Sequence, residues 1–215
     1  MPRRATARGE NLRHALAQEA ARLMAEHGIR DFLVAKRKAA ERFGVLDGAV
    51  LPKNTEIETA LAEYQRLFGG ELHLESLQAQ RRAALSAMRW LCEFEPRLVG
   101  PVLSGTATEH SEVQLHLFAD RAESVVLKLI DLGLAHAATE RRVRMSPERV
   151  LAYPGVRFEV DDQPVEATVF PCDGIRQAPV SPVDGRPMRR AGALEVQALL
   201  DGHHPDDDGA AETHR

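Results

Sequence analysis

The first 92 residues carry apolar side chains at the three- and four-residue spacing of amphipathic helices. Four apolar stripes follow one another along this part of the chain. They are Leu12–Leu16–Ala20–Leu23, Phe32–Ala35–Ala39–Phe43, Ile57–Leu61–Tyr64–Phe68 and Leu77–Ala84–Met88–Leu91. Glycines stand where the first three stripes end, and glycine accepts the left-handed conformation common at helix C-termini. The pattern therefore predicts four helices.

From Arg97 onward the pattern changes to the two-residue alternation of half-buried strands. Val113, Leu115 and Leu117 alternate with polar residues, and two later segments do the same. The later segments are Val156–Phe158–Val160 and Val165–Ala167–Val169, with a turn at 161–164 between them. A helix is expected between the first strand and this pair, and another near Leu194–Leu200 after a proline-rich loop.

These elements predict an α+β fold. We expect an N-terminal helical region over residues 1–92, followed by a small mixed β-sheet flanked by helices over residues 93–202. Residues 203–215 are acidic and contain few apolar side chains, so we expect a disordered tail.

Composition narrows the class of protein. The formal net charge of -4 gives no bulk attraction to nucleic acid, although a local basic patch is compatible with it. Cys92 and Cys172 are isolated in the sequence, as is usual in a reducing compartment. No apolar run approaches the ~20 residues that span a bilayer. We therefore expect a cytoplasmic protein that does not contact a membrane.

One constellation of residues is suited to chemistry. A turn of small residues, Ser104-Gly105-Thr106, precedes Ser111 and the strand that carries Glu112 and Gln114. Glu112 and Gln114 are two residues apart, so they project to the same side of the strand. Glu166 lies on a later strand and points away from its apolar neighbours. Oxygen ligands of this kind hold Mg²⁺, and small residues allow close approach of phosphate.

These residues resemble the nucleotidyltransferase superfamily, in which a Gly-Ser turn precedes an Asp-x-Asp strand. Gly105-Thr106 stands in the Gly-Ser place, Glu112 and Gln114 in the Asp-x-Asp places, and Glu166 in the place of the third carboxylate. The resemblance covers Leu98–Phe170, and Leu103–Phe118 also resembles bacterial proteins placed near that superfamily.

The resemblance implies a nucleotidyltransferase-like domain over residues 93–202. It would transfer a nucleoside monophosphate from an NTP to a nucleic acid or protein acceptor, with Mg²⁺ as cofactor. Glu112 and Glu166 would bind the metal, and Gln114 would orient the ligand. The phosphate-binding residues would be Ser104, Gly105, Thr106 and Ser111.

Gln114 is neutral where the superfamily has Asp, so a working enzyme and a catalytically degenerate one both remain open. In the second case the domain is a non-catalytic module for a nucleotide, RNA or protein. Arg186, Arg189 and Arg190 would then form an anion clamp in the proline-rich loop. The simplest alternative is that Glu112, Gln114 and His116 are only the solvated face of a strand.

A third alternative is a regulator that binds DNA through the N-terminal helices. Lys36, Arg37 and Lys38 form a basic cluster that suits phosphates. The next predicted helix carries several carboxylates, which repel the DNA backbone, so a helical hairpin packed on the core is favoured. His110 and His116 lack further ligands at zinc-site spacing, and we expect both to be exposed.

Overall fold

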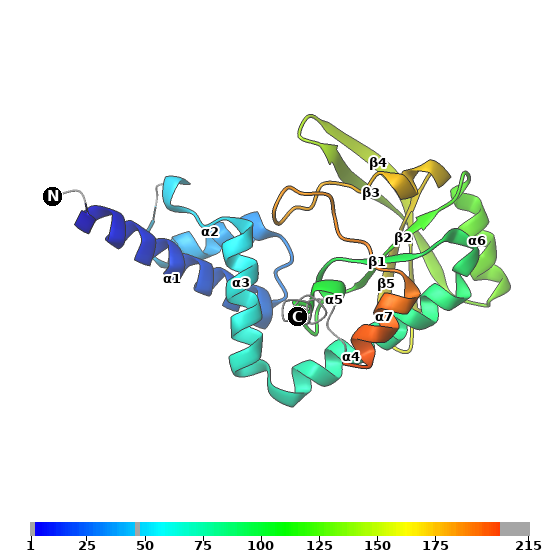
Figure 1. The fold of residues 1–215 in the computed structure, drawn as a ribbon, viewed down its shortest axis with the longest axis horizontal. Coiled ribbons are helices and arrows are strands. Elements are labelled where there is room, and N and C mark those ends of the chain that lie inside the picture. Colours follow the sequence, from blue (N-terminus) through cyan, green and yellow to red (C-terminus); the bar gives the residue numbers. More distant parts are fainter. Residues whose placement is uncertain (1–2, 46–47, 203–215) are drawn as a thin grey trace, which may run out of the picture. The chain divides into compact units, whose positions relative to one another are not determined.

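The computed structural model describes residues 3–45 and 48–202, and the fold is α+β (Figure 1). Its contacts divide the chain into two compact units. The first unit contains the described residues up to Ser76, together with Gly105–Ser111 and Pro182–Gly185. The second unit contains the rest of the described chain. The acidic tail predicted for residues 203–215 lies outside the described residues.

The first unit is helical. Its elements are α1 (Arg3–His27), α2 (Phe32–Arg42), the 3₁₀ turn η1 (Gly48–Val50), α3 (Asn54–Tyr64) and the π-helical turn η2 (Gln65–Gly69). α4 (Gly70–Trp90) begins here and continues into the second unit, so the helical region predicted for residues 1–92 is shared between the two units. The side chains that form the centre of this unit are Leu16, Ala20, Ala35, Ala39, Ile57 and Leu61. These residues come from the first three predicted stripes, but Phe43 and Phe68, at the ends of the second and third stripes, are exposed.

The second unit is built on a five-stranded mixed sheet with the order β1-β2-β5-β4-β3. The strands are β1 (Arg97–Val99), β2 (Val113–Phe118), β3 (His136–Ser146), β4 (Arg149–Val160) and β5 (Gln163–Phe170). β2 and β5 are parallel, and the other neighbouring pairs are antiparallel. The remaining elements are η3 (Cys92–Phe94), α5 (Pro101–Ser104), α6 (Ala122–Asp131), η4 (Cys172–Arg176) and α7 (Ala193–Leu200).

One face of this sheet is apolar and fully buried. It consists of Val113, Leu115, Leu117, Val156, Phe158, Val160, Val165, Ala167 and Val169. α6 contacts β4, and α7 contacts β1. Arg81 of α4 joins α4 to α5 and α7, since it donates to the carbonyls of Val102 and Leu199 at 3.2 and 3.4 Å. Burial lowers the pKa of Arg81, and the charge of Arg189 acts in the same direction.

The hairpin between β4 and β5 forms as the sequence predicts. Asp161 and Asp162 have φ angles of 50° and 60°, the left-handed conformation that two-residue hairpin turns require. β3 was not predicted: its apolar residues are few, and Ala137 and Ala138, which are adjacent and both exposed, break the alternation at its start. Within the described ranges, no helix has the length and apolarity needed to cross a membrane.

Candidate functional site

The second face of the sheet is polar and gathers the residues that the sequence singled out. Because β2 and β5 run parallel, Gln114 pairs with Glu166 and His116 with Thr168. These side chains lie opposite the apolar face, since neighbouring residues of a strand point to opposite sides. β4 extends the polar face by placing Arg157 next to Glu166.

An ion-pair cluster lies at the centre of this face. Arg141 of β3 donates its Nη1 to Glu166 Oε2 at 2.6 Å. Arg157 stands between the two predicted metal ligands, with its Nε 3.6 Å from Glu112 Oε1 and its Nη2 3.9 Å from Glu166 Oε1. The side chains of Glu112 and Glu166 are only 12% and 8% exposed, whereas that of Arg157 is 50% exposed. Two guanidinium groups therefore balance two buried carboxylates, as buried charges require.

The Gln114 side chain is held against the turn between β1 and α5. A Cβ atom at Gly100 would lie 2.8 Å from Gln114 Oε1, so the carboxamide would have to shift if any other residue stood there. Gly100 also has a φ of +72°, which disfavours any other residue. Glycine at position 100 thus allows both the left-handed backbone of the turn and the close approach of the Gln114 side chain.

His116 is buried, so the prediction of an exposed histidine is wrong. Its Nδ1 accepts a hydrogen bond from Arg190 Nε at 3.0 Å. Burial, followed by the positive charges of Arg190 and Arg141, lowers the pKa of His116 to about 3. The imidazole is therefore neutral at physiological pH. The interpretation of this part of β2 as a solvated strand face is wrong for His116, which is 6% exposed, whereas Glu112 and Gln114 are partly buried.

Arg190 closes one end of the polar face. Its Nη1 donates to the carbonyls of Gly174 and Ile175 in η4 at 2.9 and 3.3 Å. Its guanidinium carbon lies 5.0 and 5.3 Å from the ring centres of Phe118 and Phe170. Burial lowers the pKa of Arg190 to about 10, so the side chain keeps its charge near neutral pH. This side chain joins η4 to β2 and covers His116.

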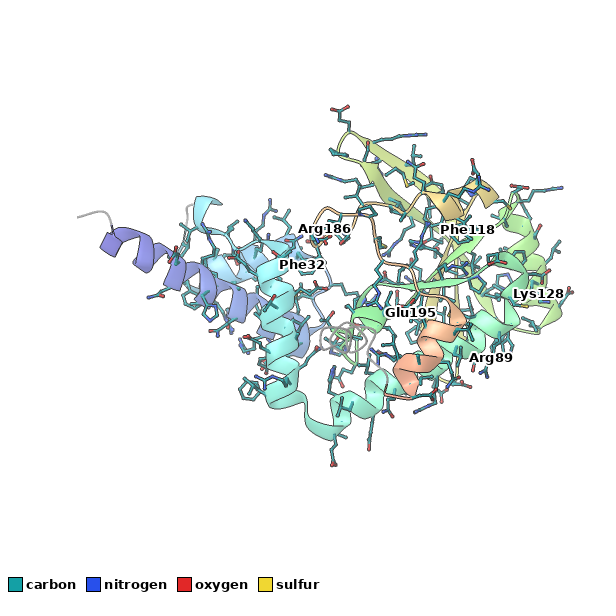
Figure 2. All side chains as sticks on the ribbon, viewed as in Figure 1. Phe32, Arg89, Phe118, Lys128, Arg186 and Glu195 are labelled. Atoms are coloured by element: carbon teal, nitrogen blue, oxygen red, sulfur yellow. The ribbon has the colours of Figure 1, made fainter. Side chains whose placement is uncertain are left out.

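The three arginines of the predicted anion clamp have different surroundings. Arg190 reaches the polar face of the sheet. Arg189 forms an ion pair with Glu195 of α7, and Arg186 is exposed in the loop, with its carbonyl accepting from Ser181 N at 2.8 Å (Figure 2). The predicted clamp is therefore divided: Arg190 makes a buried contact, Arg189 forms a surface ion pair, and Arg186 belongs to a loop turn.

The predicted phosphate-binding residues fall in both units. Ser104 ends α5 and is exposed, with its hydroxyl 3.4 Å from the carbonyl of Pro101. Gly105, Thr106 and Ser111 belong to the first unit. Thr106 is buried, and its carbonyl accepts from Gln65 Nε2 at 3.1 Å. Ser111 accepts the backbone N–H of Thr108 at 2.9 Å, which closes a local turn.

Arg141 and Arg157 are functional candidates that the sequence did not single out. Arg157 alternates with Val156 and Phe158, and the predicted hairpin turn already places it opposite Glu166. The sequence alone was therefore sufficient to place Arg157 beside Glu166. Arg141 lies on β3, which the sequence did not identify as a strand, so its contact with Glu166 becomes visible only in the structure.

Comparisons of the chain with protein-family models, curated proteins and solved structures found no match. The chemistry of the site therefore rests on its own geometry. Glu112, Gln114 and Glu166 offer the oxygen ligands that Mg²⁺ prefers. Both carboxylates, however, already bind guanidinium groups whose charges balance theirs. In this arrangement the residues do not fit a divalent cation, and among the described residues no three His, Cys, Asp or Glu side chains form a metal-binding group.

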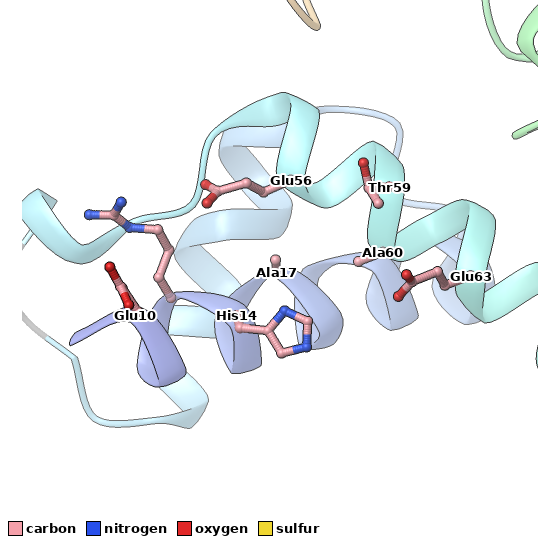
Figure 3. Close-up of a pocket in the computed structure, with 8 residues that line it drawn as sticks. Glu10, His14, Ala17, Glu56, Thr59, Ala60 and Glu63 are labelled. Atoms are coloured by element: carbon pink, nitrogen blue, oxygen red, sulfur yellow. The ribbon is translucent and has the colours of Figure 1, made fainter. Parts of the chain in front are cut away.

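The first unit contains a separate cavity of about 370 Å³ between α1 and α3 (Figure 3). It is lined by Glu10, Arg13, His14, Ala17, Glu56, Thr59, Ala60 and Glu63. Its carboxylates outnumber its single guanidinium, which makes it unsuitable for phosphate. Burial also raises the pKa of Glu58 on α3, and Lys36 of the basic cluster has a pKa lowered by burial. These features give no support to DNA binding through α2 and α3.

Proposed function

We propose that the second unit is a nucleotidyltransferase-like domain that binds the phosphate groups of a nucleotide on the polar face of its sheet, without a resident divalent cation. Arg141 and Arg157 are the proposed phosphate ligands. This proposal keeps the non-catalytic alternative suggested by the sequence, but its phosphate ligands are Arg141 and Arg157 in place of the loop residues Arg186, Arg189 and Arg190. The observation that carries it is the position of Arg157, which is bound by Glu112 and Glu166 on one side and half exposed on the other.

Phosphate recognition follows from the geometry of the guanidinium group. An arginine has five N–H donors, so the two carboxylates leave donors of Arg157 available to a ligand. The carboxylates also restrict the side chain before a ligand arrives, which reduces the entropy lost on binding. Arg141 is held in the same way by Glu166 and is 43% exposed. Two oriented guanidinium groups on neighbouring strands suit a phosphate that accepts several hydrogen bonds.

The test is titration calorimetry of ATP, GTP, CTP and UTP in the presence of EDTA. We expect at least one nucleotide to bind, and Arg157→Gln to weaken its affinity by about tenfold or more, since a charged hydrogen bond contributes roughly 1.5–3 kcal/mol. Arg121→Gln is the matched control, because Arg121 is exposed at the start of α6. Equal affinities for the two variants would contradict the proposed role of Arg157.

A second candidate is Mg²⁺-dependent nucleotidyl transfer. The register of β2 and β5 favours it, because it sets Glu166 beside Gln114, as the resemblance requires of the third carboxylate. Glu112 and Glu166 would hold the metal only if it displaced Arg141 and Arg157 from both carboxylates, and Gln114 would orient the nucleotide. Glu112→Ala and Glu166→Ala should each abolish metal-dependent NTP turnover. Turnover that survives both changes would exclude this assignment.

A further inference from the structure

The β3–β4 hairpin extends beyond the rest of the sheet (Figure 1). β4 pairs with β5 only over residues 155–160, so residues 149–154 pair with β3 alone and form a two-stranded ribbon. One face of the ribbon is covered, since Val143, Leu151 and Tyr153 pack against the small core of Phe118, Met145 and Phe170. The opposite face has no such cover.

That opposite face is basic. Arg142 and Arg144 project from β3 two residues apart, and their partners on β4 are the small residues Ala152 and Val150. Arg149 lies at the tip of the ribbon, and all three arginines are exposed. Residues two apart on a strand are separated by about 6.8 Å. Arg142 and Arg144 therefore stand side by side on this face, next to Ala152 and Val150. Arg149 precedes Val150 on β4, so it projects to the other face at the tip of the ribbon. We call Arg142, Arg144 and Arg149 the ribbon arginines.

The ribbon arginines differ from other arginines of the second unit. Arg81, Arg97, Arg141, Arg157, Arg189 and Arg190 each bind a carboxylate, a carbonyl or an imidazole of the chain. Within the part of the chain that the structure describes, the side chains of the ribbon arginines form no ion pair or hydrogen bond. The nearby carboxylates Glu140 and Glu148 do not pair with them. Their charge is available to a partner.

We propose that the ribbon arginines bind the phosphate backbone of a nucleic acid. The formal net charge of the chain is -4, so attraction to a polyanion has to be local, and the ribbon supplies it. A two-stranded ribbon also fits the major groove of B-DNA. This inference is independent of the nucleotide site, which lies on the other face of the sheet.

The salt dependence of the binding constant reports how many phosphates the chain contacts. Three phosphate contacts predict a slope of log K against log salt of about -2.7 for duplex DNA and about -2.1 for a single strand. The dissociation constant should therefore rise about 40-fold or about 20-fold, respectively, between 50 and 200 mM salt. The larger slope would identify a duplex as the ligand, and the smaller one a single strand.

The experiment is fluorescence anisotropy of labelled 20-mer duplex DNA and single-stranded RNA with the full chain, using roughly these salt concentrations. The triple variant Arg142→Gln, Arg144→Gln, Arg149→Gln should lose the salt-dependent binding. The control, Arg66→Gln, Arg82→Gln, Arg121→Gln, removes the same charge from exposed positions on η2, α4 and the start of α6. It should keep the wild-type slope. Circular dichroism confirms that each variant is folded.

Three results would overturn the proposal. The first is no binding of either oligonucleotide by the wild-type chain at low salt. The second is an equal loss in the ribbon and control variants, which would show that only net charge matters. The third is equally tight binding of poly-glutamate, which would identify an acidic protein surface as a partner. Parallel titration with ATP separates the two proposals, because the ribbon variant should bind nucleotide as the wild type does.

Discussion

Glu166 and Arg141 form a 2.6 Å ion pair between strands that are not neighbours in the sheet. Glu166 belongs to β5 and Arg141 to β3, so the guanidinium reaches across β4 to the carboxylate. Arg157, which lies on β4, approaches the same carboxylate from its other oxygen. The polar face is thus a charge-balanced cluster that depends on the pairing of three strands.

Loss of Arg141 should destabilise the second unit. Arg141→Met leaves the buried Glu166 with one distant cation. We expect the free energy of unfolding to fall by roughly 1–3 kcal/mol. This is below the range for fully buried pairs, because Arg141 is half exposed. Urea unfolding measures this loss. Arg142→Met is the matched control, since it is the next residue on β3 and makes no ion pair in the described chain; its effect should stay within about 0.5 kcal/mol. Equal effects would show that the ion pair adds no stability.

The contact between Gly100 and Gln114 predicts a second stability effect. Gly100→Ala would bring a Cβ atom to 2.8 Å from Gln114 Oε1 at a φ of +72°. Gly133→Ala is the control, because Gly133 has a φ of +69° with nothing near its Cβ. Backbone strain should lower the free energy of unfolding of both variants by about 1 kcal/mol. The free energy of Gly100→Ala should fall further, because of its additional contact with Gln114. Thermal unfolding of Gly100→Ala with and without Gln114→Ala should show recovery in the double variant. If the double variant is no more stable than Gly100→Ala alone, the contact with Gln114 is not the cause of the additional loss.

His116 predicts a loss of stability in mild acid. Its pKa in the folded chain is about 3, whereas the ordinary value is 6.5, so the unfolded chain binds the proton more readily. Stability is therefore complete above the unfolded value and decreases as the pH falls from about 6.5 toward 3. Between pH 7 and pH 5 the loss should be about 2 kcal/mol, at about 1.4 kcal/mol per pH unit.

Urea unfolding of His116→Asn checks this prediction, because the Asn carboxamide keeps an acceptor for Arg190 but does not titrate. The wild-type chain should lose about 2 kcal/mol more than the variant over this pH range. His110→Asn serves as a control at an exposed histidine and should behave as the wild type. A wild-type chain and His116→Asn with the same pH dependence would contradict the buried neutral state.

Part of this structure could be predicted from the sequence. The stripe of Leu16 and Ala20 identifies α1, and Asp161-Asp162 identifies the hairpin that sets Glu166 on its face. These features are local, so periodicity and turn chemistry reveal them. The position of Gln114 beside Glu166 needs the parallel pairing of β2 and β5, which the sequence suggested only through a resemblance.

Other features depend on contacts between distant residues. His116 is covered by Arg190, which follows it by 74 positions, so its strand pattern alone indicates an exposed polar face. The apolar residues of β3 that face the small core are only Val143 and Met145, too short a pattern to predict the strand that carries Arg141. His116 and Arg141 both lie on the polar face. Side chains there pair with one another through hydrogen bonds and ion pairs, so they leave no hydrophobic pattern in the sequence.

In the proposed nucleotide site, guanidinium groups rather than a metal ion provide the positive charge. The most direct measurement is calorimetric titration of the wild-type chain with ATP, GTP, CTP and UTP, each in EDTA and in Mg²⁺. We expect at least one nucleotide to bind in EDTA, with an affinity that Mg²⁺ does not increase. Binding that occurs only with Mg²⁺ would contradict it and would favour Glu112 and Glu166 as metal ligands.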